Sequence, residues 1–338
     1  MSANTAWNGS ESDFPAGGSV RQKLGHAVKC AGMAVSLDEW QSWQFRLADN
    51  QVELLADAGL VSEAVDPDGR ELMIRCGAAL FHLKLALKRF GCLGQVELFP
   101  EFDQSGLVAR IHRGFSPDCG AQEVALFEAM ARGRNAFASW NEAPVSEAAF
   151  ELFESAMAGA KAWLEFSQCA SSRNRLLEFA ALGVKAPTPG NQPEAPPGNS
   201  RVAQWTRPLL TFIVRTGEAG PITVEAAGTR ADQMAMLAVI KTKTDDKHGW
   251  LATGQAMARA RLQARVSGIS SQVFDQAFRS RYVREELRTS IGHKGFAQAI
   301  IGFGTNPATW TAVAPAWQSA GHDVVLEPAI PLRFRMDE

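Results

Sequence analysis

Several features that mark particular classes of protein are missing from this 338-residue sequence. No apolar run approaches the ~20 residues that a membrane-spanning helix needs. The first residues, MSANTAWNGSESDFPAGGS, have neither the basic start nor the apolar core of a signal peptide. A formal net charge of -2 gives no general attraction to nucleic acid or to an anionic membrane. We therefore expect a cytoplasmic protein with no nucleic-acid or membrane partner, and a disordered tail at residues 1–18.

Residues for metal binding or nucleophilic catalysis are also scarce. The five cysteines are odd in number and never form a CxxC pair, which argues against a disulfide framework and a structural zinc site. The six histidines are scattered and include no HExxH motif. There is no GxSxG elbow and no Walker loop, since Gly292-His293-Lys294-Gly295 is a turn without the rest of that motif. The sequence thus predicts no metal site and no catalytic side chain.

The composition that remains is that of a globular protein. Hydrophobic residues make up 46% of the chain and charged residues 21%, and the length allows one large domain or two lobes. One segment departs from this composition, because five prolines stand among Gly, Asn and Ser between Val184 and Val202. Prolines in so polar a segment cannot join a helix or a central strand. We predict a Pro-rich loop at 184–202.

The most informative stretch is Val65 to Leu87, VDPDGRELMIRCGAALFHLKLAL. A turn that contains Asp66 and Asp68 is followed by an ion-pairable Arg70-Glu71 and then by a helical pattern. One face of this helix is apolar at three- and four-residue steps, namely Leu72, Cys76, Leu80, Leu83 and Leu87. Gly77-Ala78-Ala79 interrupt that face with small side chains, which lets another backbone or a flat ligand approach closely.

Helices and strands alternate along the rest of the chain, which predicts an α+β or α/β layer structure. Trp43–Leu47 and Val52–Leu55 form a predicted hairpin with a turn at Ala48–Asn50. Gly91 is the expected stop of the helix at 70–90. Other helices are predicted at 19–33, 120–132, 146–160, 171–182, 246–266 and 281–291, and other strands at Gln95–Phe99, Leu107–Ile111, Trp163–Phe166, Leu209–Val214 and Ala299–Gly304.

Taken together, these segments resemble the Acg-like branch of the FMN-dependent nitroreductases, in which two nitroreductase half-folds are fused in one chain. The best match is DPDGRELMIRCGAALFHLKLAL. WLATGQAMARARLQARVSGIS, VREELR and FAQAIIGFG also match, and the resemblance runs from about Val20 to Arg335. It implies an α+β, nitroreductase-like fold of two half-domains, each with a sheet packed by helices, at 19–115 and 116–338.

The resemblance also implies a flavin-facing segment, which in relatives reads approximately APSxHNxQPWxF. Residues 34–45 keep part of this pattern, with matches at Ser36, Gln41, Trp43 and Phe45. His-Asn has become Asp38-Glu39 and the proline has become Ser42. An amide both donates and accepts a hydrogen bond, whereas an ionised carboxylate only accepts. Ser36, Glu39 and Gln41 are the implied ring contacts, and the alternative for Glu39 is a solvent-facing side chain.

Two arginine pairs compete for the phosphate of the implied cofactor. Arg132 and Arg134 resemble a family loop close to RRTxRxPF, and two guanidiniums can grip a phosphate dianion. Their alternative role is to cap the helix at 120–132. Arg333 and Arg335 resemble a C-terminal basic pair, and alternation places them on one side of an extended segment. Simple solvation is the alternative there.

A third flavin-side segment, close to SxLNQPxE in relatives, aligns with Ser271–Arg279. Gln276 is kept, the asparagine has become Asp275, and the glutamate has become Arg279. Asp275 and Gln276 complete the implied cofactor-binding residues. Polar positions have thus changed in three motifs while the packing residues remain.

Two residue types leave alternatives open. Trp40 and Trp43 could stack on a flat ring, although core packing is the commoner use of tryptophan. The acidic pairs Asp66/Asp68 and Asp245/Asp246 are expected to cap turns and helix starts.

The resemblance implies an FMN-dependent oxidoreductase that takes electrons from NADH or NADPH and reduces a small organic acceptor. No motif specifies the nicotinamide or the acceptor. The changed polar positions support an alternative: a degenerate relative that binds or sequesters flavin, or another ligand or protein, without efficient turnover. Because both halves lie in one chain, either a monomer or a homodimer is compatible with the sequence.

Overall fold

The structure of the protein is a computed structural model that describes residues 13–35, 42–57, 66–100, 106–116, 119–131, 153, 161–167, 170–182, 236–267, 269–274, 276–290, 292, 294–304 and 335–336. The predicted strand Leu209–Val214, and the predicted helix 146–160 apart from Phe153, lie outside these residues. None of the helices in the described ranges is both long and apolar enough to cross a bilayer.

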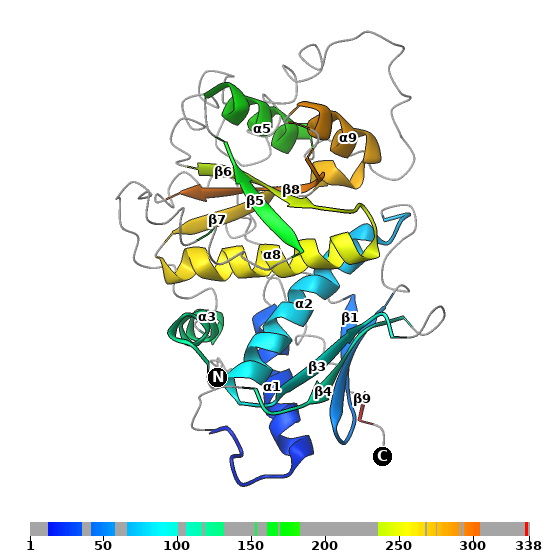
Figure 1. The fold of residues 1–338 in the computed structure, drawn as a ribbon, viewed down its shortest axis with the longest axis vertical. Helices are drawn as coiled ribbons and strands as arrows, with labels where there is room; N and C mark the ends of the chain where they lie inside the picture. Colours follow the sequence, from blue (N-terminus) through cyan, green and yellow to red (C-terminus); the bar gives the residue numbers. More distant parts are fainter. Residues whose placement is uncertain are drawn as a thin grey trace, which may run out of the picture. The chain divides into compact units, whose positions relative to one another are not determined.

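The chain divides into two compact units whose segments interleave in sequence. Unit 1 is Met1–Ser139, Trp250–Val266 and Glu327–Glu338, and unit 2 is Trp140–Gly249 and Ser267–Leu326. Each unit contains one sheet and several helices (Figure 1), which confirms the α+β class. The division into two duplicated halves at residue 115 stays a prediction.

The sheet of unit 1 has five strands in the order β3-β4-β2-β1-β9. The predicted hairpin is confirmed, since β1 and β2 pair antiparallel with Leu47 opposite Val52. β9 pairs with β1 in the parallel sense, and the other neighbours are antiparallel. The strands are β1 (Trp43–Leu47), β2 (Gln51–Ala56), β3 (Leu93–Leu98), β4 (Leu107–Arg113) and β9 (Arg335–Met336).

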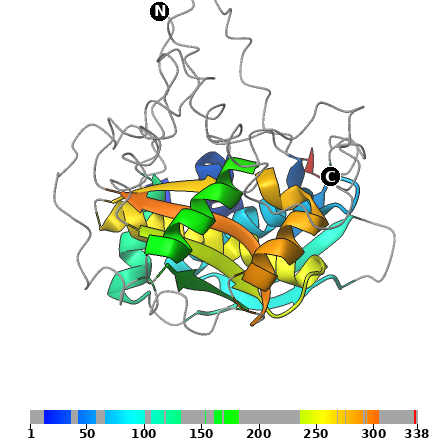
Figure 2. The same cartoon turned by 90° about the horizontal axis from the view of Figure 1, so that it is seen from above.

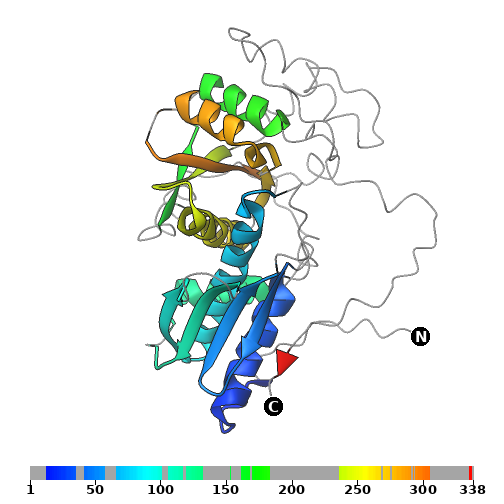
Figure 3. The same cartoon turned by 90° about the vertical axis from the view of Figure 1, so that its right-hand side faces the viewer.

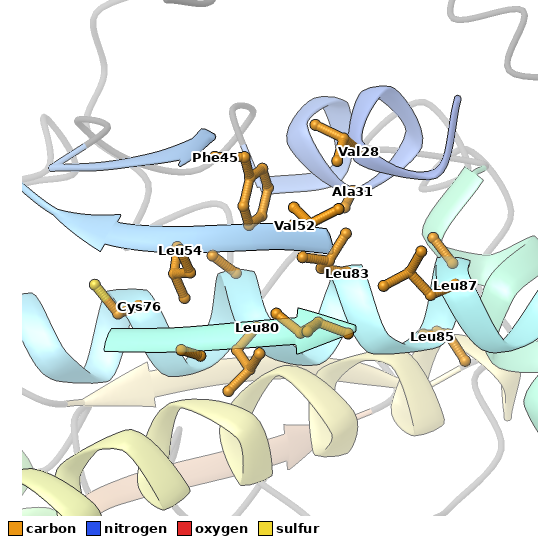
Figure 4. Packing of buried hydrophobic residues seen from close by; sticks show 14 of the residues in the cluster. Val28, Ala31, Phe45, Val52, Leu54, Cys76, Leu80, Leu83, Leu85 and Leu87 are labelled. Atoms are coloured by element: carbon orange, nitrogen blue, oxygen red, sulfur yellow. The ribbon is translucent and has the colours of Figure 1, made fainter. Parts of the chain in front are cut away.

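Two helices, α1 (Val20–Val35) and α2 (Arg70–Arg89), pack against each other and against the β1–β2 hairpin. Figure 3 shows α1 behind this hairpin. Every residue of the predicted apolar face of α2 is at most 5% exposed. Figure 4 shows the resulting core, in which Val28 of α1, Phe45 of β1 and Val52 of β2 approach Leu83 of α2. Burial of this stripe therefore holds the helices on one face of the sheet.

Local chemistry sets the ends of α2. A side-chain oxygen of Asp66 accepts a hydrogen bond from the Leu72 backbone N–H (3.0 Å), so the expected capping role is confirmed for this residue. At the other end Gly91 has φ 64°, and its N–H bonds the Lys88 carbonyl (3.0 Å) while that of Cys92 bonds the Leu87 carbonyl (2.8 Å). This is the left-handed helix stop that glycine adopts without steric cost.

The small residues of α2 accommodate another helix. A Cβ added at Gly77 would collide with the Leu251 carbonyl and would crowd Gly254, both in α8 (Lys247–Val266). A Cβ added at Gly254 would collide with the Ile74 carbonyl of α2. The two backbones therefore touch at reciprocal glycines, within unit 1. The sequence left open whether another backbone or a flat ligand approaches the small residues of α2. At Gly77 the structure places the backbone of α8.

The sheet of unit 2 is antiparallel throughout, in the order β5-β6-β8-β7. The strands are β5 (Ala162–Phe166), β6 (Met236–Thr242), β7 (Ser270–Phe274) and β8 (Phe296–Gly304). Helices α5 (Ala170–Leu182) and α9 (Arg281–Ser290) lie over this sheet (Figure 2), with Phe179 of α5 and Leu287 of α9 in its core. β6 and β7 were not expected from the sequence.

Candidate functional site

Most of the residues implied as cofactor ligands fall outside the described part of the chain. For two, Gln276 and Arg335, the structure describes the backbone. The others stay predictions without a structural position: Ser36, Glu39, Gln41, Arg132, Arg134, Asp275 and Arg333.

The last residues of the first flavin-facing motif, residues 34–45, enter the sheet of unit 1. The Ser42 carbonyl accepts a hydrogen bond from the Asp57 N–H (2.8 Å). The Ser42 side chain is 1% exposed, and its Oγ has no hydrogen-bond partner among the described residues. Trp43 is also buried, with its ring 4.8 Å from that of Phe45. The core-packing alternative is therefore confirmed for Trp43.

The C-terminal basic segment reaches the same strand. In the parallel pairing of β1 with β9, Arg335 lies opposite Arg46 and Met336 lies opposite Leu47 (Figure 3). Arg335 is thus at the outer edge of the sheet, beside the strand that directly follows residues 36–41. The pairing of β1 with β9 brings together two segments that are far apart in sequence. The family resemblance implies ring contacts for the first and phosphate contacts for the second.

A row of charged residues crosses this sheet from strand to strand. The register pairs Glu97 with Arg110, Arg110 with Glu53, and Glu53 with Arg46. Glu53 is 3% exposed and accepts hydrogen bonds from Arg46 Nε (2.7 Å) and Arg110 Nε (2.8 Å). Burial alone raises the pKa of Glu53, but the two guanidiniums outweigh it and bring the pKa below its usual value. The row ends at Arg46 of β1, which lies opposite Arg335 of the neighbouring strand β9.

The segment around Gln276 belongs to unit 2. β7 leads into η5, a short 3-10 helix at Gln276–Arg279, whose Phe278 is fully buried in the core. Arg284 of α9 fixes this turn, because its Nη1 donates to the carbonyls of Phe278 (2.7 Å) and Arg279 (3.2 Å). Sequence reasoning missed Arg284, which is 4% exposed, since an arginine on a charged helix normally faces water.

Asp245 anchors Arg284 from the other side. Its carboxylate accepts from Arg284 Nε (3.1 Å) and from the amide of Gln298 (3.0 Å), a side chain with no exposed surface. Gln298 also donates to the hydroxyl of Thr242 (3.1 Å). Asp245 thus has a role that the sequence did not indicate, because it binds a buried guanidinium, and its expected capping role stays a prediction.

Asp246 does cap a helix. Its carboxylate accepts from the Gly249 N–H (2.9 Å) in the first turn of α8 and from the hydroxyl of Thr244 (2.9 Å). Burial alone raises the pKa of Asp246, but these hydrogen bonds outweigh it and the pKa is lowered.

Nucleophilic and metal-binding groups contribute little in the described residues. Burial raises the pKa of Cys30 to about 11 and that of Cys76 to about 12, so both thiols are protonated at neutral pH. In the same residues, no group of three or more His, Cys, Asp and Glu side chains is placed to hold a metal ion.

Two known proteins are similar to this chain, one over almost its full length and one over a shorter segment. It is 25% identical over 340 residues, 95% of each chain, to a Mycobacterium tuberculosis (strain H37Rv) protein named "Putative NAD(P)H nitroreductase Rv3131". It is 39% identical over 74 residues, 22% of each chain, to "Putative NAD(P)H nitroreductase acg" of the same organism. The chain is a homologue of these proteins, which are named as putative NAD(P)H nitroreductases. No protein-family model matches it.

A crystal structure of a nitroreductase with bound FMN from Bacteroides fragilis aligns with 54% of this nitroreductase homologue and 88% of its own chain. The identity is 11% and the TM-score is 0.33.

Proposed function

We propose that the chain is an FMN-dependent NAD(P)H oxidoreductase of the nitroreductase type that reduces a small organic acceptor. The relatives named as NAD(P)H nitroreductases support an oxidoreductase in general. The observation that carries the finer proposal is the parallel pairing of β9 with β1, which puts Arg335 beside the strand that continues the flavin-facing segment.

The described residues next to this edge fit a flavin. Ser42 brings a buried hydroxyl without a partner among the described residues, within the flavin-facing segment and directly after the implied ring contact Gln41. Arg335 and Arg333 would hold the phosphate, with Arg132 and Arg134 as the competing pair. Guanidiniums suit this role because they form charge-assisted, bidentate contacts with phosphate oxygens.

In this assignment Ser36, Glu39 and Gln41 line the ring. A carboxylate at Glu39 accepts from a ring N–H but cannot donate to a ring carbonyl. Its negative charge also disfavours an anionic reduced ring in a poorly solvated site. In this assignment Glu39 therefore affects the reduction potential of the flavin and takes no part in proton transfer.

A bound FMN supplies the electron-transfer chemistry, and the protein contributes binding, orientation and exclusion of water. No side chain has to act as an acid, base or nucleophile. The lack of a catalytic dyad in the sequence is consistent with this division of labour.

The deciding experiment is the absorption spectrum of the purified full-length chain. We expect a yellow protein whose flavin band bleaches when NADH or NADPH is added without oxygen and returns with an organic acceptor. A colourless protein that takes up no added FMN would contradict the proposal. A yellow protein that neither nicotinamide reduces would favour the second candidate, flavin sequestration without turnover, which the changed residues Glu39, Asp275 and Arg279 support.

The phosphate assignment is tested by Arg335→Ala, with Arg21→Ala as a control. Arg21 bonds Asp49 on the surface (3.3 Å) and lies on α1, away from the β9 strand in sequence. Loss of a charged hydrogen bond to phosphate is expected to weaken FMN binding by about 1.5–3 kcal/mol, measured by quenching of flavin fluorescence. Equal affinities for the two variants would place the phosphate elsewhere.

A further inference from the structure

Unit 1 contains a group of cations where α2 approaches α8, apart from the β1 edge. Lys84 of α2 extends to α8 and donates to the side-chain carbonyl of Gln255 (Nζ–Oε1 3.3 Å). Arg259 follows Gln255 by four residues on the helix. Residues at this spacing lie on one face of a helix, so the guanidinium is on the side of α8 that Lys84 reaches.

The nearby negative charge does not balance these cations. Glu123 of α3 (Ala121–Ala131) forms an ion pair with Lys88 (2.6 Å), one turn along α2 from Lys84. Within the described part of the chain, no carboxylate forms an ion pair with Lys84 or with Arg259. Lys84, Lys88 and Arg259 thus carry three positive charges against the single carboxylate of Glu123.

The excess of positive charge is reflected in lowered pKa values for Lys84 and Arg259. Burial lowers the pKa of Lys84, and the positive charge of Arg259 lowers it further. Burial also lowers the pKa of Arg259, against a smaller opposite effect of Glu123. Two partly desolvated cations that repel each other are unfavourable unless an anion joins them.

Lys84 and Arg259 also have hydrogen-bond donors that the described residues do not use. Arg259 Nε is buried and has no acceptor among the described residues. The Lys84 ammonium has three N–H donors, and the Gln255 contact uses one of them. An oxyanion between the two side chains would accept from both and neutralise the excess charge.

We propose that Lys84 and Arg259 form a binding site for the phosphate group of a small molecule, separate from the Arg333–Arg335 segment. Gln255 orients Lys84, and Lys88 keeps Glu123 from closing the site. A phosphate satisfies more donors than a carboxylate here, because it offers acceptor oxygens in three directions.

The test is a calorimetric titration of the full-length chain with inorganic phosphate, at constant ionic strength set with chloride. Lys84→Gln and Arg259→Gln are expected to weaken phosphate binding at least tenfold each, while Lys84→Arg retains it. The matched control is Lys29→Gln, which removes an exposed lysine of α1 and leaves the affinity within twofold.

Two results would overturn the site: no saturable binding of phosphate to the parent chain, or equal affinities for the parent and both charge-removing variants. Helix content by circular dichroism confirms that each variant is folded. Melting temperature gives a second readout that needs no ligand, since Lys84→Gln removes a repulsion and is expected to melt no lower than the parent chain. Repeating the titration with saturating FMN separates this site from the proposed cofactor site: undiminished phosphate binding is expected, and competition by FMN would make this the phosphate site of the cofactor and overturn a separate site.

Discussion

The two units bury charge in opposite ways. In unit 1 the central group is a carboxylate, Glu53, set in the middle of a regular sheet between two arginines. In unit 2 it is a guanidinium, Arg284, set between a carboxylate and two backbone carbonyls that belong to irregular segments. The first arrangement reinforces a strand register that backbone hydrogen bonds already define. The second holds a 3-10 turn that the sheet does not control.

The difference also concerns access to water. Arg46 and Arg110, the partners of Glu53, have side chains that are 39% and 22% exposed. Arg284 and Asp245 are 4% and 15% exposed. If Glu53 is lost in unit 1, its two arginines can be solvated, whereas loss of Arg284 in unit 2 leaves a carboxylate that is only 15% exposed. The energetic consequence of a single substitution should therefore be larger in unit 2.

The largest effect is expected for Arg284→Met, which leaves the largely buried Asp245 without this cation. Breaking a buried pair in this way typically costs about 3–5 kcal/mol. The measurement is the free energy of unfolding from urea denaturation. Arg281→Met, at an exposed position of the same helix, is the control and is expected to stay within about 0.5 kcal/mol of the parent. A small loss for Arg284→Met would show that the unit 2 network is dispensable.

A smaller effect is expected for Glu53→Gln. The amide keeps the shape but weakens two charged hydrogen bonds, for an expected loss of about 1.5–3 kcal/mol by the same urea measurement. Asp49→Asn, in the exposed turn of the hairpin, is the matched control and should change little. A loss at Glu53 greater than that at Arg284 would reverse the ranking of the two units.

The stabilising effect of Glu53 is expected to disappear in acid. Because the folded-state pKa is lowered, its contribution is fully present above the unfolded value of about 4.3 and is lost as pH falls through the folded value. The difference in unfolding free energy between the parent and Glu53→Gln should therefore be constant above about pH 4.3 and shrink as the pH falls below that value. A difference that stays constant over this lower range would show that the charge of Glu53 does not stabilise the sheet.

The smallest effect is expected at the end of the row. Glu97 is 34% exposed and lies 3.9 Å from Arg110 and 3.3 Å from His112. Exposed ion pairs contribute about 0–1 kcal/mol, so Glu97→Gln should lower the melting temperature much less than Glu53→Gln does. Equal effects would mean that burial does not govern the row.

The regular elements of unit 1 could be predicted because each buries one face. The spacing of apolar residues by three and four positions from Leu72 to Leu87 predicts α2. Two apolar segments joined by a polar turn predict the β1–β2 hairpin. β6 could not be found in this way, since all seven of its residues are buried and it shows no alternation. A strand that is buried on both faces has no solvent-facing side that an alternating sequence pattern could report.

The candidate site was less predictable for a different reason. The pairing of Arg335 with Arg46 joins residues nearly a whole chain apart, and no local pattern encodes such a register. Buried charges were equally hidden. Glu53 alternates with Val52 and Leu54 as a solvent-facing residue would, and its burial depends on arginines from two other strands. The family resemblance supplied the nitroreductase assignment that neither pattern contains.

The reciprocal glycine contact between α2 and α8 has a consequence for biosynthesis. Gly77 leaves the ribosome early. The part of α8 that packs against it, which includes Leu251 and Gly254, follows only after all of residues 140–249 have been translated. Until then the nascent N-terminal region lacks Trp250, Leu251 and Leu262, which belong to the buried core of unit 1. A fragment that ends at residue 115 or 139 would lack these residues permanently, so we expect it to be less soluble than the full-length chain.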